Sequence, residues 1–152
     1  YSNWKICYSF KGNDIIQSVL IKTRGEQLIM FFRPHSDPRY IWKSHSTDQG
    51  ISWTTPDMTS LPNPLSGIST ISVNNSIATI YNHTHEHKRY PLSVSVSRDK
   101  GTTWGEHWNL DNVKVEISYP SFILGNNNIV HGLYTYNRRM IKYVKLNPDN
   151  FL

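Results

Sequence analysis

The chain has 152 residues with a formal net charge of +5, and 38% of its residues are hydrophobic and 12% aromatic. This content supports a folded core and excludes a disordered chain. Lysine and arginine are scattered without a basic run, so the charge favours an anionic partner or substrate and does not predict nucleic-acid binding. The single cysteine, Cys7, excludes a disulfide framework and falls in an apolar segment, where we expect a structural role in a strand. No apolar run has the length of a transmembrane segment.

Short alternating runs rich in Ile, Val, Tyr and Phe recur along the chain, and each predicts a β-strand. In chain order these runs are 16–22, 27–33, 40–45, 68–73, 76–81, 91–97, 119–124, 128–135 and 140–146. Turn signals rich in Gly and Asn separate consecutive runs at 24–25, 74–75 and 125–127. No window carries a helical period. The sequence therefore predicts an all-β fold.

Two copies of one eight-residue phrase stand 51 positions apart, at 46–53 and 97–104, and both fit Ser-x-Asp-x-Gly-x-x-Trp. The shared positions are Ser46, Asp48, Gly50, Trp53, Ser97, Asp99, Gly101 and Trp104. The Asp side chain accepts backbone N–H groups and ties the loop, and the Gly supplies a positive φ. The Trp opens the next strand and packs over the loop. We expect a self-tied turn between two outer strands, with a structural role.

The 51-residue period extends beyond these phrases, because Gln17, Ile68 and Tyr119 also stand 51 positions apart near the starts of alternating runs. Such a period in β-rich sequence indicates propeller blades. Trp4 would end a further copy of the phrase that begins upstream. Three blades leave sheet edges open, so we expect the remaining blades from a longer chain or from a second copy. The predicted units are the last strand of a preceding blade at 1–15, blades at 16–66 and 67–117, and a partial blade at 118–152.

The repeated phrases resemble the Asp boxes, or BNR repeats, of the sialidase-type propeller. Further resemblance to bacterial, fungal and plant sialidase-like proteins lies at 61–67, 118–121, 134–135 and 141–144. It spans roughly residues 16–146 and implies a six-bladed propeller, of which this chain is the C-terminal half. It also implies an exo-glycosidase that removes a terminal acidic sugar, sialic acid, from a glycan by a retaining mechanism. Such chemistry requires no cofactor and no metal.

The carboxylate of a sialic acid calls for planar, permanently charged donors, so arginines are its expected ligands. Family members use three arginines, an Asp acid/base, and a Tyr nucleophile activated by a Glu, and they are exceptions to the two-carboxylate rule for glycosidases. By the resemblance, Tyr119 matches the nucleophile, Arg33 the second arginine and Arg89 the third. The first arginine and the Asp would lie upstream of residue 1. Without the family phrase, Tyr119 would be read as packing and both arginines as solvated charges.

Gln17 stands where the enzymes of this family place the activating Glu. A Gln cannot take a proton from a phenol, so Tyr119 would lack its usual base, and Glu116 is the candidate replacement. We also assign Asn63, Ser66 and Tyr134 to substrate binding, although Asn63 and Ser66 fit better the shaping of a Pro-flanked loop near the site. The alternative function is a non-catalytic carbohydrate-binding or scaffolding propeller, in which Gln17 reflects lost catalysis.

An alternating run of histidines with one glutamate could offer imidazoles to zinc or copper. It consists of His83, His85, Glu86 and His87. The run falls in a predicted loop, and no second ligand pair at metal spacing accompanies it. We therefore predict no metal site there.

Overall fold

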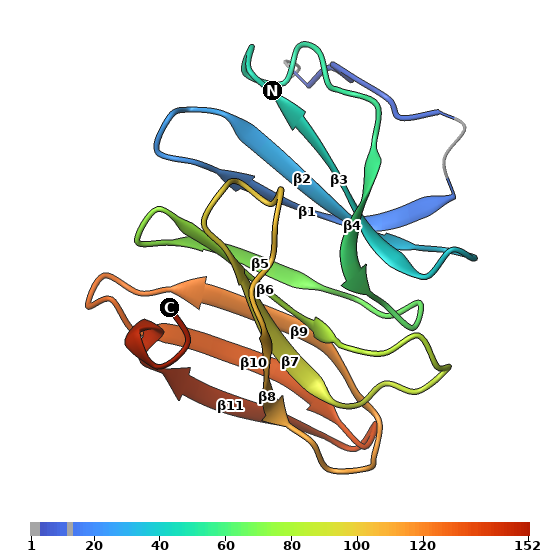
Figure 1. Cartoon of the computed structure of the whole chain (residues 1–152), viewed down its shortest axis with the longest axis vertical. Helices are drawn as coiled ribbons and strands as arrows, with labels where there is room; N and C mark the ends of the chain where they lie inside the picture. Colours follow the sequence, from blue (N-terminus) through green and yellow to red (C-terminus); the bar gives the residue numbers. More distant parts are fainter. Residues whose placement is uncertain (1–3, 12–13) are drawn as a thin grey trace.

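The computed structural model describes residues 4–11 and 14–152. In this part of the chain, eleven β-strands form three antiparallel sheets, and a short 3₁₀ helix, η1 (Pro148–Asn150), follows the last strand. Figure 1 shows the three sheets one after another in chain order, with the second sheet between the other two. No helix in the described ranges has the length and apolar character needed to cross a membrane.

Each sheet is a simple meander, in which consecutive strands are neighbours. The first sheet contains β1 (Ile15–Lys22), β2 (Leu28–Pro34), β3 (Tyr40–Ser46) and β4 (Asp57–Pro62). The second contains β5 (Ser69–Val73), β6 (Ser76–Asn82), β7 (Leu92–Ser97) and β8 (His107–Asp111). The third contains β9 (Ile117–Leu124), β10 (Val130–Tyr136) and β11 (Met140–Leu146). The first strands β1, β5 and β9 lie next to one another, as Figure 1 shows.

All nine predicted runs coincide with strands, and their ends differ from those of the strands by at most two residues. The sequence did not single out β4 and β8, because their polar, partly exposed residues lack an apolar alternation. These strands follow the two repeated loops, but they begin at Asp57 and His107. The prediction that Trp53 and Trp104 open the next strand was therefore wrong, and each tryptophan belongs to its loop.

Two hydrophobic clusters hold the sheets together. One joins the first and second sheets through residues that include Ile29, Phe31 and Tyr81. The other joins the second and third sheets through residues that include Val94 and Phe122. Because both of its faces are covered, the second sheet is buried along the whole of β6 and β7. Burial of apolar area on both faces fixes the stacking of the sheets.

The segment before β1 differs from its prediction. Residues 4–11 carry no strand, and residues 1–3 and 12–13 of the predicted strand at 1–15 lie outside the described residues. Cys7 is exposed and not in a strand, which contradicts its predicted structural role in a strand. Trp4 is 99% exposed. Phe10 covers the outer side of the first sheet, with its ring 5.0 Å from that of Phe32 and 5.9 Å from that of Trp53.

Candidate functional site

The two repeated loops close one end of the sheets with matching hydrogen bonds. In the first, Ser52 N donates to Asp48 Oδ1 at 2.9 Å and Gly50 N donates to Ser46 Oγ at 2.8 Å. Trp53 Nε1 donates to the carbonyl of Gly50 at 3.2 Å. Gly50 has φ +88°, a conformation that a side chain would strain. The predicted tie by the Asp side chain is thus confirmed in this loop.

The second loop repeats the arrangement. Thr103 N donates to Asp99 Oδ1 at 2.8 Å, and Gly101 N donates to Ser97 Oγ at 2.7 Å. Hydrogen bonds from Thr103 lower the pKa of Asp99, and those from Ser52 lower the pKa of Asp48 to about 2. These carboxylates are fully occupied by their own loops, so we assign them a structural role.

At the opposite end of the sheets, two side chains stand at irregular points of the first strands. Gln17 in β1 has φ +46°, and the register between β1 and β2 shifts there. Tyr119 in β9 has φ +53°, and the register between β9 and β10 shifts there as well. A positive φ is uncommon for residues other than Gly, and such bulges re-aim side chains. Backbone of this kind motivates a search for function at this end.

Gly67 lies between these two residues and leaves room for both. A methyl group added to Gly67 would lie 3.5 Å from Cδ1 of Tyr119 and 3.9 Å from Oε1 of Gln17. The three residues line a hollow of about 300 Å³, together with Ile68 and Pro120. Tyr119 is 53% exposed. The chain thus brings Gln17 and Tyr119 to one open hollow.

Arg89 reaches Tyr119 from the segment before β7. Its Nη1 lies 3.4 Å from the phenol oxygen, and its guanidinium carbon lies 5.4 Å from the centre of the ring. The same Nη1 donates to Glu116 Oε1 at 3.2 Å, and Arg138 Nε donates to Glu116 Oε2 at 2.6 Å. Burial raises the pKa of Glu116, but the bond from Arg138 and the charge of Arg89 outweigh it, so that the pKa is lowered. Glu116 is therefore an ionised anchor for two arginines.

Arg33, near the end of β2, stands close to the same group. Burial and the charge of Arg89 lower the pKa of Arg33, and Tyr119 acts in the opposite direction. Its Nη1 donates to the carbonyl of Leu65. Within the described residues, its Nε is buried and has no hydrogen-bond partner. Two guanidinium groups that repel each other, with a donor left over, form a site suited to an anion.

A buried amide network fixes the segments that carry these side chains. Asn82, at the end of β6, donates through Nδ2 to the carbonyls of Pro91 at 3.1 Å and Ile117 at 3.0 Å. Its Oδ1 accepts from Ser66 Oγ at 2.7 Å, and Asn63 Oδ1 accepts from Ser66 N at 2.8 Å. Asn82 connects the loop before β5, the segment before β7 and the start of β9. The sequence did not single it out, because one Asn at a strand end carries no signal of this role.

Three predicted substrate-binding residues are not placed to contact a ligand. Asn63 and Ser66 are each 0% exposed and use their polar atoms within the network, so they shape the loop. Tyr134 is 4% exposed and donates to Asp111 Oδ2 at 3.0 Å. Burial and this carboxylate raise the pKa of Tyr134. Alternation along β10 turns Tyr134 into the core between the second and third sheets.

The histidine run is divided among different partners. The ring of His83 stacks on His107 at 3.6 Å, and burial together with His107 lowers its pKa to about 4. His87 Nε2 lies 2.5 Å from Nη2 of Arg39, whose Nη1 donates to the carbonyl of His85. In the parts of the chain that the structure covers, no group of three or more His, Cys, Asp or Glu is placed to hold a metal ion.

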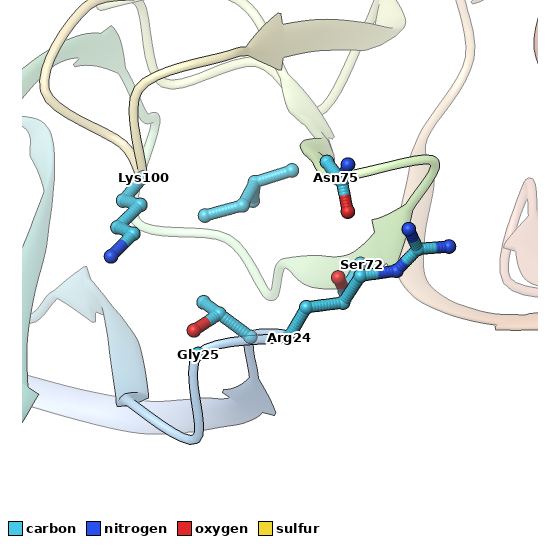
Figure 2. A pocket seen from close by; sticks show the side chains of 7 residues that line it. Arg24, Gly25, Ser72, Asn75 and Lys100 are labelled. Carbon is cyan, nitrogen blue, oxygen red and sulfur yellow. The ribbon is translucent and has the colours of Figure 1, made fainter.

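A smaller hollow of about 170 Å³ opens at the end of the sheets that carries the repeated loops. Figure 2 shows Lys100 and Asn75 on different sides of it, with Arg24 and Ser72 below. Residues in turns line this hollow, and their conformation explains their type, as for Asn75 at φ +66°. The hollow beside Tyr119 is the better candidate site, because it gathers bulged backbone, repelling arginines and a phenol.

Comparison with known proteins places the chain in a family. The BNR repeat-like domain matches residues 2–132, so the chain belongs to this family. No curated protein matches the sequence.

Solved structures show the same fold. The NanB sialidase from Streptococcus pneumoniae superposes with a TM-score of 0.78 and 15% identity, over 95% of this chain and 25% of that chain. The intramolecular trans-sialidase from Ruminococcus gnavus gives 0.74 and 16%, over 93% and 34%. The GH93 α-L-arabinofuranosidase of Fusarium graminearum gives 0.62 and 14%, over 87% and 44%. The chain has an all-β, sialidase-like BNR fold and spans a quarter to less than half of these chains.

Proposed function

We propose that the protein is a retaining glycosidase that removes a terminal acidic sugar, most simply sialic acid, with Tyr119 as its nucleophile. The observation that carries this proposal is the placement of Arg89 Nη1 3.4 Å from the hydroxyl of Tyr119, with Arg33 close enough to repel Arg89. The fold alone does not select a sugar, because the matched proteins include sialidases and an arabinofuranosidase. The paired arginines favour a substrate that carries a carboxylate.

In this proposal, Arg33 and Arg89 hold the carboxylate of the sugar beside its anomeric carbon. The phenol oxygen of Tyr119 attacks that carbon, and the bond to the leaving-group oxygen breaks as an acid donates a proton to it. Water then attacks the anomeric carbon and releases Tyr119, which gives overall retention. A neutral phenol suits this role, because a carboxylate nucleophile would be repelled by the charge of the substrate. The positive charge of Arg89 stabilises the negative charge that develops on the phenol oxygen.

The reaction also needs an acid that protonates the leaving group and a base that accepts the proton of the phenol. Glu116 is the carboxylate beside Tyr119 in the described residues, and arginines occupy both of its oxygens. We therefore assign Glu116 to positioning Arg89, and we expect the acid from another part of the full-length protein. Gln17 lines the same hollow as Tyr119 but accepts no proton, so the phenol proton passes to solvent at the exposed Tyr119.

Gln17 supports one alternative, a carbohydrate-binding protein without catalysis. The test is hydrolysis of a fluorogenic sialoside by the full-length protein and by its Tyr119→Phe variant. We expect hydrolysis by the wild-type protein and a loss of about a thousandfold or more in the variant, with an unchanged melting temperature. Equal hydrolysis by both proteins would refute Tyr119 as the nucleophile. Binding of the sialoside without hydrolysis would establish the alternative.

We further propose that the three sheets are consecutive blades of a six-bladed propeller, with units at 16–66, 67–117 and 118–152. The period of 51 residues and the meander within each sheet support this. The remaining blades would come from a longer chain or from a second copy. The molar mass in solution distinguishes these two sources, because a stable monomer excludes the second copy.

A further inference from the structure

A second hollow, of about 330 Å³, is lined in part by Arg89 and has no role in the chemistry above. Its walls come from the segment before β7, the segment before β9 and the turn between β10 and β11. Four cationic side chains line it against one carboxylate, Glu116: they are Lys88, Arg89, Lys114 and Arg138. We call it the basic hollow. Its lining predicts an anionic occupant.

Arg89 connects the basic hollow with the hollow beside Tyr119, although no described residue lines both. Arg89 lines the basic hollow, and its Nη1 lies 3.4 Å from the phenol oxygen of Tyr119. Glu116 lines the basic hollow and accepts from the same Nη1 at 3.2 Å. A ligand whose terminal sugar occupies the Tyr119 side therefore has the basic hollow as a neighbouring space.

The single carboxylate of Glu116 does not neutralise the positive charge of the four cationic side chains that line the basic hollow. Arg89 and Arg138 occupy both oxygens of Glu116, so Lys88 and Lys114 form no ion pair with this carboxylate. Lys88 pairs at the rim with Glu86 at 2.5 Å. In the described ranges, Lys114 forms no ion pair, and it is exposed. An anion that enters gains charge-assisted hydrogen bonds from cations that are already in place.

We propose that the basic hollow binds a second anionic group, a sulfate ester or a carboxylate, on the sugar next to the terminal acidic sugar. This inference rests on the proposed function and names the substrate class more closely. The preferred substrate is a glycan with anionic groups on two neighbouring sugars. Both kinds of anion meet the same donors, so the shared chemistry is a compact oxyanion.

The test measures binding to the full-length Tyr119→Phe variant, which leaves the ligands intact. Titration calorimetry compares 3′-sialyl-N-acetyllactosamine with its form sulfated on galactose, and 3′-sialyllactose with α2,8-linked disialyllactose. We expect the doubly anionic ligand of a pair to bind about three- to tenfold more tightly at low salt, and the gain to shrink at high salt. A gain with the sulfated ligand assigns a sulfate ester, and a gain with the disialyl ligand assigns a carboxylate. Equal affinity within both pairs would overturn the proposal.

Matched variants locate the effect. Changing Lys88→Gln together with Lys114→Gln removes two charges from the basic hollow, and we expect it to abolish the gain. Changing Arg24→Gln together with Lys100→Gln removes two charges from the smaller hollow at the opposite end of the sheets (Figure 2), and we expect the gain to persist. A gain that survives the first pair of substitutions would contradict the location.

A sulfated sugar without sialic acid separates this inference from the proposed function. We expect galactose 6-sulfate, but not galactose, to bind the wild-type protein weakly, and the Lys88→Gln and Lys114→Gln substitutions to abolish that binding. If it binds in this way while no sialoside binds, the basic hollow stands and the proposed function fails. If sialosides bind but neither a sulfate nor a second carboxylate adds affinity, the proposed function stands and the basic hollow fails.

Discussion

The end of the sheets that carries the loops 46–53 and 97–104 differs from the end that carries Tyr119 in how its polar groups are bonded. In the loops, Asp48 and Asp99 are satisfied by groups within four residues of them. At the other end, Arg33 keeps a buried Nε that has no partner among the residues the structure describes, and Arg89 binds Glu116 from 27 positions away. One end is closed by local bonds, and the other leaves donors available.

This difference between the two ends separates residues that stabilise the fold from residues that form the candidate site. The loops occur twice with the same bonds, so their residues explain how a sheet is closed and not what the protein binds. The Tyr119 end differs from sheet to sheet: Gln17 and Tyr119 stand in the first strands of the first and third sheets, and Gly67 lies just before the first strand of the second. A side chain at Gly67 would narrow the hollow between the other two. The candidate site is therefore formed by residues that differ from one sheet to the next.

The largest effect is expected at Asn82, the network residue that serves the Tyr119 end. Asn82→Ala leaves the carbonyls of Pro91 and Ile117 and the hydroxyl of Ser66 unpaired in the core. We expect the free energy of unfolding to fall by about 2 to 4 kcal/mol, and sialoside affinity to fall with it. Chemical denaturation and titration measure the two. Thr70→Val, a buried change elsewhere in the second sheet, is the control and should leave affinity unchanged.

The next effect tests the two arginines. Arg33→Lys and Arg89→Lys keep the charge but lose the planar donor pair, and each should lower kcat/KM for a sialoside about 30-fold. Arg24→Lys, at the loop end, should have no effect. Steady-state kinetics measure this loss. An unchanged kcat/KM in both site variants would show that the two arginines do not bind the substrate.

A gain of function is expected at Gln17. Gln17→Glu places a carboxylate beside Tyr119 and supplies a proton acceptor, so kcat should rise by about tenfold or more. The pH–rate profile should acquire an acidic limb from the new carboxylate. Absence of hydrolysis in both the wild-type and the variant protein would favour the carbohydrate-binding alternative.

The smallest effect is expected at the loops. Asp48→Asn and Asp99→Asn remove carboxylates whose pKa lies below the ordinary Asp value of about 3.9. A lowered pKa stabilises the folded state above the unfolded value, and the contribution is lost as the pH falls through the folded value. Both variants should therefore melt below the wild type at pH 7, and the difference should shrink between about pH 4 and pH 2. Sialoside kinetics should not change, and a changed KM would contradict the division between the two ends.

Much of the fold was predictable because strand alternation and the 51-residue period are local signals. The strands β4 and β8 were not predicted, because their polar, partly exposed residues show no apolar alternation. At the site, Gln17 and Tyr119 line one hollow and Arg89 contacts Tyr119, while the roles that the resemblance implied for these residues stay predictions.

The predicted substrate contacts failed where burial depends on long-range packing. Ser66 donates to Asn82 at the end of β6 and to Asn63, and Tyr134 is turned inward by its register. Nothing within a few residues of these positions marks them as buried. The same reason hid Asn82, whose partners lie in distant segments.

The most direct test of the central claim, that Tyr119 is the nucleophile at the open end of the sheets, is covalent trapping. The full-length protein is incubated with a 2,3-difluoro sialosyl fluoride, whose fluorine atoms slow release of a covalent intermediate, and its peptides are analysed by mass spectrometry. We expect one sialyl adduct on the peptide that contains Tyr119, and its absence in Tyr119→Phe. An adduct on another residue, or hydrolysis of sialosides without any adduct, would contradict the account.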